Sequence, residues 1–273
     1  MVPAPHPSWT TLVACLGLTL GVAAGGAEAA GGVEAEGGAG AERAPAAERP
    51  VYVTLGTGFD FSRGDFGLER DSTLYYVPFD VTVDVASWRL VLRVPFLHSD
   101  GVVGLAVGGP TGLESDRVSG LGDSITSVAY LFAPPNAVLP WVEVTGQISW
   151  PTRTREPLGQ GGFAFAAQLD AFQRYGDWTP FARVGRNFYT VGSLDDRFYT
   201  AIGVSHAWTA SFATGLSYDW LESVAPGLKD GHELVPFASF DLEGGWNFDP
   251  YAVIGLSSGS PDYGIGFAVR FER

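Results

Sequence analysis

Apolar and polar residues alternate one by one along most of the chain between residue 51 and residue 273. The first stretch is clear, because Val51, Val53 and Leu55 are separated by Tyr52 and Thr54. Successive side chains of a strand point to opposite faces, so each stretch has one apolar and one polar face. About a dozen such stretches of about ten residues follow one another. The pattern predicts an all-β fold, a transmembrane antiparallel up-and-down β-barrel of about 12 strands.

The connections between the predicted strands alternate in length, which supports the barrel independently. The long, charged connections are 63–71, 98–120, 151–161 and 222–232. The short connections are Ala86-Ser87, 133–139, 174–178, Thr209-Ala210 and Gly244-Gly245. Bacterial barrels have short periplasmic turns and longer extracellular loops, so we expect the first strand to start on the periplasmic side.

The same parity places charged residues on the interior face of the predicted barrel. The candidate lumen-lining residues are Arg89, Arg93, Arg183, Arg270, Asp60, Asp80, Asp84, Asp123, Glu143, Asp170, Asp219 and Asp241. Charges that face one another across a wet lumen can screen solutes by charge and size. Alternatively, they pair and fill the interior, as in small filled barrels.

Glycines also recur on the predicted interior face. They are Gly56, Gly58, Gly185, Gly203, Gly215, Gly255, Gly264 and Gly266. They either keep a narrow path open or relieve bending strain in the wall. If the first and last strands pair with flush ends, Gly56 lies beside Gly266 and Gly58 beside Gly264 at the seam.

Composition excludes several classes of function. The formal net charge of −14 argues against nucleic-acid binding, which needs clustered Lys and Arg. The single cysteine, Cys15, precedes the predicted barrel, so we expect no disulfide, cysteine-ligated metal site or thiol nucleophile within it. No cofactor is implied. Residues 51–273 contain no apolar run long enough for a transmembrane helix.

The N-terminal region is typical of an exported protein. An apolar run over residues 11–24 precedes Ala27-Glu28-Ala29, a small-x-small cleavage pattern, so residues 1–29 are predicted to be a signal peptide. Lipidation at Cys15 is the alternative, but the apolar run continues past that residue. Residues 30–50 are rich in Ala, Gly and Glu and are predicted to be a disordered linker.

Short motifs resemble the family of outer-membrane transporters associated with the meta-pathway of phenol degradation. They are Gly120-Leu121-Gly122-Asp123-Ser124-Ile125, Trp150-Pro151-Thr152, Thr179-Pro180-Phe181-Ala182, and the closing Ser258-Gly259-Ser260-Pro261-Asp262-Tyr263-Gly264 with Arg270-Phe271. The resemblance implies an outer-membrane barrel that lets small molecules cross, including aromatic ones. It transfers no functional residues. Barrels commonly end on an aromatic residue that the barrel-assembly machinery reads, whereas here Glu272-Arg273 follow Phe271.

The resulting prediction is a passive outer-membrane channel for small solutes, with outer-membrane lipid and the barrel-assembly machinery as its partners. The alternative is a structural or adhesive barrel with a plugged lumen. A lipase at the outer rim is a third hypothesis, with His98-Ser99-Asp100 or His232-Glu233 as its base region. We expect no enzyme, because adjacent loop residues rarely form a triad and His206 has lipid-facing parity.

Overall fold

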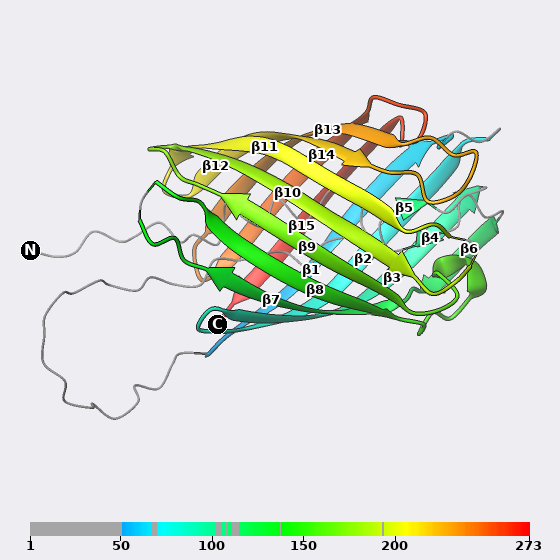
Figure 1. Cartoon of the computed structure of the whole chain (residues 1–273), viewed down its shortest axis with the longest axis horizontal. Helices are drawn as coiled ribbons and strands as arrows, with labels where there is room; N and C mark the ends of the chain where they lie inside the picture. The colour runs from blue at the N-terminus through cyan, green and yellow to red at the C-terminus, as the bar shows by residue number, and fades with distance from the viewer. Residues whose placement is uncertain are drawn as a thin grey trace, which may run out of the picture.

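The chain forms a single cylinder of tilted strands in a computed structural model (Figure 1). The residues that the structure describes are 51–66, 70–101, 105–106, 109–110, 115–136, 138–192 and 194–273. The predicted signal peptide (1–29) and linker (30–50) lie outside these residues. No helix in the described ranges is long and apolar enough to cross a bilayer.

Long strands account for nearly all of the regular structure. They are β1 (Val51–Gly64), β2 (Ser72–Val85), β3 (Trp88–Gly101), β6 (Ser115–Leu121), β7 (Ser124–Phe132), β8 (Trp141–Trp150), β9 (Ala164–Phe172), β10 (Trp178–Tyr189), β11 (Arg197–Thr209), β12 (Phe212–Leu221), β13 (Gly231–Leu242), β14 (Trp246–Gly255) and β15 (Tyr263–Glu272). Two-residue strands β4 (Leu105–Ala106) and β5 (Gly109–Pro110) pair with each other, and a short 3₁₀ helix, η2, spans Glu156–Leu158.

Neighbouring strands pair antiparallel around the whole cylinder, and β15 pairs with β1 to close it. Strands β6 and β7 pair with successive stretches of β3 and are separated only by Gly122-Asp123. They therefore occupy one position in the wall, which has 12 positions in total. The predicted 12-strand antiparallel barrel is confirmed.

The two faces of the wall differ in the way that the alternation predicts. Leu55, Leu92 and Ile202 point outward and are exposed, whereas Asp60 and Asp170 point inward and are buried. A closed barrel has no free strand edge, so its backbone groups are satisfied even where no water is available.

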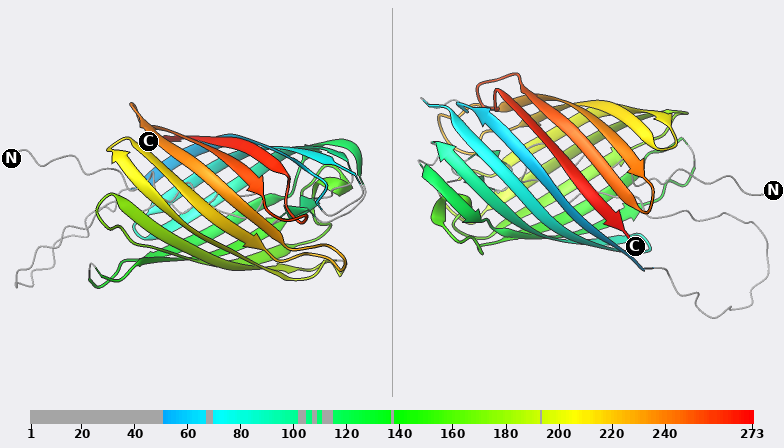
Figure 2. Two further views of the ribbon diagram at one scale, coloured as in Figure 1. Left: turned by 90° about the horizontal axis from the view of Figure 1, so that it is seen from above. Right: turned by 180° about the vertical axis from the view of Figure 1, so that it is seen from behind.

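The two ends of the cylinder carry connections of different length (Figures 1 and 2). We call "the loop end" the end with connections 151–163, 222–230 and 256–262. We call "the turn end" the end with 86–87, 173–177, 210–211, 243–245 and the C terminus. The predicted alternation of long and short connections therefore holds.

Two details of the prediction are wrong. The segment 98–120 is not entirely a loop, because β3 continues to Gly101 and β6 pairs with its end. At the seam, Gly56 lies opposite Arg270 and Gly58 opposite Ala268, not opposite the predicted glycines. Barrel closure requires tilted strands and a staggered register, so the strand ends are not flush.

Four inward glycines lie directly opposite an aromatic residue of a neighbouring strand. This role differs from both predicted ones, an open path for solutes and relief of bending strain. The pairs are Gly185–Tyr199, Gly203–Phe181, Gly215–Phe237 and Gly266–Tyr251. A methyl group on any of these glycines would lie within about 2.4 Å of the partner's ring. The glycines thus provide the space in which flat rings lie against the wall, an arrangement that fixes register.

We expect Gly215→Ala to destabilise the barrel by about 1–3 kcal/mol, because overpacking displaces the Phe237 ring. The matched control is Gly146→Ala in β8, where the added methyl group meets nothing within 4 Å. Urea unfolding in lipid vesicles, followed by tryptophan fluorescence, measures both variants. Equal stability of the two variants would contradict the proposed role of the glycines.

Candidate functional site

The interior face holds ion pairs formed across neighbouring strands. Arg93 Nε lies 2.6 Å from Asp80 Oδ1, and its terminal nitrogen lies 2.8 Å from Asp80 Oδ2. Arg89 Nε lies 2.8 Å from Asp84 Oδ1. In both cases the partners are directly opposite one another in the β2–β3 pairing. The two-residue turn at the end of this hairpin fixes that register, so the pairs follow from local geometry.

A second set of charges continues the network around the wall. Arg183 Nε lies 2.7 Å from Asp170 Oδ1, directly across the β9–β10 pairing. Asp170 is also opposite Glu143 in the β8–β9 pairing, and Glu143 lies 3.8 Å from Arg89. The charges therefore form one belt from β2 to β10, which we call "the charge belt": Asp80, Asp84, Arg89, Arg93, Glu143, Asp170 and Arg183.

The remaining predicted residues lie outside the charge belt. Tyr251 donates a hydrogen bond of 2.5 Å to Asp60, and Asn247 donates one to Asp241. Arg270 lies 2.5 Å from Asp249. Their role in lining a path for solutes stays a prediction.

Asp219 and Asp123 lie at other points of the structure. Asp219 is buried opposite Glu233 on the inner face. Asp123 occupies the break between β6 and β7, where its carboxylate accepts hydrogen bonds from the backbone of Arg153 and Gln160, at 3.1 and 2.9 Å. It anchors a loop to the wall instead of facing charges across the barrel.

Sequence reasoning missed two buried acids, Asp249 and Glu233. Both have inward parity within strands that were predicted correctly, so the signal was present. The lipase hypothesis places Glu233 at the outer rim together with His232, but the two side chains point to opposite faces of the wall. His232 contacts the outward Tyr218, at 2.6 Å, and Glu233 is fully buried.

An apolar cluster crosses the interior between the middle of the barrel and the turn end. Its buried members are Leu131, Phe172, Phe181, Val235, Phe237, Tyr251 and Val253. These residues come from β7, β9, β10, β13 and β14, on different sides of the wall. We call this set "the apolar cluster"; its side chains meet across the lumen and reduce the space available to solutes.

A loop packs against the inner side of the wall at the loop end. Residues 151–163, which include η2, form "the plug segment". Its Leu158 is 1% exposed and packs against the inward side chains of Tyr76 and Leu97. Gln160 donates a hydrogen bond of 3.3 Å to the inward Ser149. The plug segment is also hydrogen-bonded to the wall by Thr152 and Thr154 and by the backbone of Arg153 and Gln160. Leu158 is its deeply buried apolar contact.

The interior is packed at the level of its charged residues. Glu143, Asp170 and Glu233 are exposed to no more than 2%. Lumenal charges of a wide, water-filled pore would be solvent-exposed, so this conformation has no wide pore at these positions. No group of three or more His, Cys, Asp or Glu within the described ranges is arranged to hold a metal ion.

The rim histidines do not form the triads that the lipase hypothesis needs. His98 Nδ1 lies 2.5 Å from Ser119 Oγ, whereas Asp100 pairs with Arg117 at 2.6 Å and Ser99 is buried. His206, by contrast, lies against the rings of two outward tryptophans.

Comparison with known proteins supports the fold. No family model and no curated protein matches the chain. A crystal structure of an outer membrane channel from Pseudomonas putida F1 is similar over 85% of this chain and 100% of that chain, at 13% identity and a TM-score of 0.66. The Pseudomonas putida toluene transporter TodX covers 83% of this chain and 90% of its own, at 9% identity and a TM-score of 0.41, too low to carry an argument. The chain shares the barrel fold of the first protein, and the predicted link to phenol degradation stays a prediction.

Proposed function

We propose that the protein is an outer-membrane channel for small solutes whose lumen is closed in the conformation described above. The observation that carries the proposal is the contrast between the two faces of the wall. Large apolar side chains such as Phe79, Leu92 and Ile202 are exposed on the outside, and the inside carries the charge belt. An apolar exterior of this extent suits hydrocarbon, and a charged interior suits the passage of polar solutes.

Closure at the loop end depends on a segment that can move without unfolding the wall. The plug segment is a connection between strands, and loops of this kind move more readily than the elements that they connect. Its displacement would uncover Tyr76 and Leu97 and open the charged interior to solvent. We propose further that the solutes include aromatic compounds, as the family resemblance implies.

A filled structural barrel is the second candidate, and the burial of Asp170 and Glu233 favours it. Recording from the purified protein in planar lipid bilayers separates the two. The channel predicts discrete current steps, and the ion selectivity measured in the same experiment reports the effect of the interior charges. Absence of steps over a range of voltages and salt concentrations would overturn the channel and leave the filled barrel.

We expect Ile202→Arg to destabilise the barrel in lipid by about 2–4 kcal/mol, because this position lies on the outer face at mid-strand. Val138→Arg is the control, since Val138 lies in the exposed connection after β7. Urea unfolding from lipid vesicles measures both. If Ile202→Arg were as mild as the control, the outer face would not contact hydrocarbon.

A further inference from the structure

The inner face is not equally buried on all sides of the barrel. Four charged side chains of β2, β3 and β15 keep 13–18% of their surface exposed: Asp80, Asp84, Arg93 and Arg270. On the opposite side, the charged side chains of β8, β9 and β10 are 0–3% exposed: Glu143, Asp170 and Arg183. Distance from the turn end does not explain the difference, because Glu143 is the third residue of β8 and Arg93 is the sixth of β3. One side of the interior is therefore more accessible to water than the other.

Gly56 of β1 lies in the middle of the accessible side. It is directly opposite Asp80 in the β1–β2 pairing and Arg270 in the β1–β15 pairing. A Cβ atom at Gly56 would lie 3.4 Å from Asp80 Cβ and 3.6 Å from Arg270 Cγ, which are ordinary contacts, so a small side chain fits there. The inward Thr82 is also partly exposed. We call this part of the inner face "the open strip": Gly56, Asp80, Thr82, Asp84, Arg93 and Arg270.

The charges of the open strip are balanced by ion pairs. The pairs are Arg93–Asp80, Arg89–Asp84 and Arg270–Asp249, at 2.6, 2.8 and 2.5 Å. Each pair joins one positive and one negative side chain, so the charges of the three pairs sum to zero. The open strip thus offers polar contacts without a net charge. Such a surface suits small polar solutes and favours ions of neither sign.

A layer of buried side chains closes the open strip toward the loop end. Tyr76 is directly opposite Asp60 in the β1–β2 pairing, and Tyr251 donates a hydrogen bond of 2.5 Å to Asp60. These three side chains are buried, and the layer lies about 13 Å beyond Gly56 along β1. Tyr251 belongs to the apolar cluster, and Tyr76 packs against Leu158 of the plug segment. A single layer therefore separates the open strip from the plug segment.

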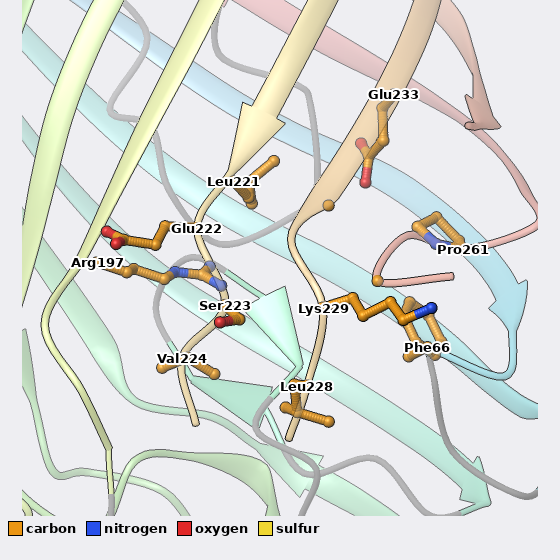
Figure 3. A pocket seen from close by; sticks show the side chains of 12 residues that line it. Phe66, Arg197, Leu221, Glu222, Ser223, Val224, Leu228, Lys229, Glu233 and Pro261 are labelled. Atoms are coloured by element: carbon orange, nitrogen blue, oxygen red, sulfur yellow. The ribbon is translucent and has the colours of Figure 1, made fainter. Parts of the chain in front are cut away.

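The cavity near the loop end, beside β11, β12 and β13, is too small to be part of a route for solutes. Its volume is about 20 Å³, and its lining includes Arg197, Leu221 and Pro261. Figure 3 shows these side chains around it, on two strands and the connection before β15. A cavity of this size holds about one water molecule. The accessible side of the interior is thus the better candidate for a route.

We propose that solutes cross the barrel along the open strip, and that Tyr76 is the barrier between the plug segment and this strip. The inference rests on the proposed function and gives the channel a route. Displacement of the plug segment uncovers Tyr76, and a shift of the Tyr76 side chain then connects the loop end with the open strip. The opposite wall, with its buried ion pair of Arg183 and Asp170, is a packed support that solutes do not contact.

Cysteine labelling tests the position of the open strip without requiring any current. Because Cys15 is the only cysteine, Gly56→Cys and Thr82→Cys are each combined with Cys15→Ser. The matched controls are Ser127→Cys and Ser217→Cys, at buried inward positions of β7 and β12. Cysteines in the open strip should react with charged methanethiosulfonates at least about tenfold faster than the controls, because a buried thiol reacts only after a local opening. Mass spectrometry of the detergent-solubilised full chain measures the rates, with positive and negative reagents in parallel.

Single-channel recording tests the barrier. Tyr76→Ala should raise the conductance, because it removes the side chain that separates the open strip from the plug segment. Tyr199→Ala truncates another buried inward tyrosine, on β11, and should leave the conductance unchanged. Reaction of Thr82→Cys with the methanethiosulfonate should reduce the current, since the added group then occupies the open strip.

The inference is overturned if the four cysteines react at equal rates, or if Tyr76→Ala and Tyr199→Ala change the conductance equally. Fast labelling of the open strip in a protein that gives no current would refute the channel and leave the strip as a water-filled recess. Current from a protein whose four cysteines react equally would refute the open strip and leave the channel.

Discussion

Asp170→Ala is expected to destabilise the barrel by about 3–5 kcal/mol, since it leaves the charge of Arg183 buried without its partner. Arg183 Nε lies 2.7 Å from Asp170 Oδ1, and both side chains are almost fully buried. The other carboxylate oxygen accepts a hydrogen bond of 2.6 Å from Gln168. The substitution therefore removes the partners of two buried donors at once.

The matched control for this substitution is Asp71→Ala, in the exposed ion pair with Arg63. Both of those side chains are about half exposed, so the expected cost is about 0–1 kcal/mol. Adding Arg183→Met to Asp170→Ala should recover most of the lost stability, because the buried guanidinium that lost the Asp170 carboxylate is then removed as well. Urea unfolding in lipid vesicles gives the free energy of unfolding of all three variants. Equal losses for Asp170→Ala and Asp71→Ala would show that water reaches the charge belt.

Leu158→Ala is expected to open the channel more often without unfolding the wall. Leu158 is almost completely buried against Tyr76 and Leu97, and truncation of a buried leucine costs about 2–5 kcal/mol. If about 2 kcal/mol of this contact holds the plug segment in place, the ratio of open to closed molecules rises roughly thirtyfold.

Single-channel recording of Leu158→Ala measures the open probability directly. Leu139→Ala is the control, since Leu139 is exposed at the turn end and contacts no part of the plug segment. Leu158→Ala is expected to show longer open times, with an unchanged urea midpoint for unfolding of the wall. Unchanged open times would mean that the plug segment does not control access, and closure would then depend on the apolar cluster alone.

Most strands could be predicted because their side chains alternate between an apolar outer face and a polar inner face. Strand β6 could not. Its sequence from Ser115 to Leu121 has no apolar face, and it is a strand because it pairs with the end of β3. The inward fold of the plug segment was equally hidden. Leu158 is its one deeply buried apolar contact, and its other contacts with the wall are hydrogen bonds from scattered polar residues, so the segment shows no periodic pattern.

In the candidate site, likewise, some contacts could be predicted from the sequence and others could not. The turn Ala86-Ser87 fixes the register of its hairpin, so the partner of Arg93 could be read from the sequence by counting outward from the turn. The contact between Arg89 and Glu143 reaches past an intervening strand and depends on the tilt of the wall. The glycine–aromatic pairs likewise depend on register, and a parity pattern gives only the face on which each residue lies.

The central claim is that one face of every strand contacts lipid and the other faces an enclosed interior. The only cysteine of the chain is Cys15, outside the barrel, so spin labels on single cysteines along β12 report each position separately in the C15S background. Collision with oxygen dissolved in the bilayer should be high for labels at Leu216 and Tyr218 and low at Ser217 and Asp219. Equal oxygen accessibility at all four positions, or water accessibility at Leu216, would contradict the account.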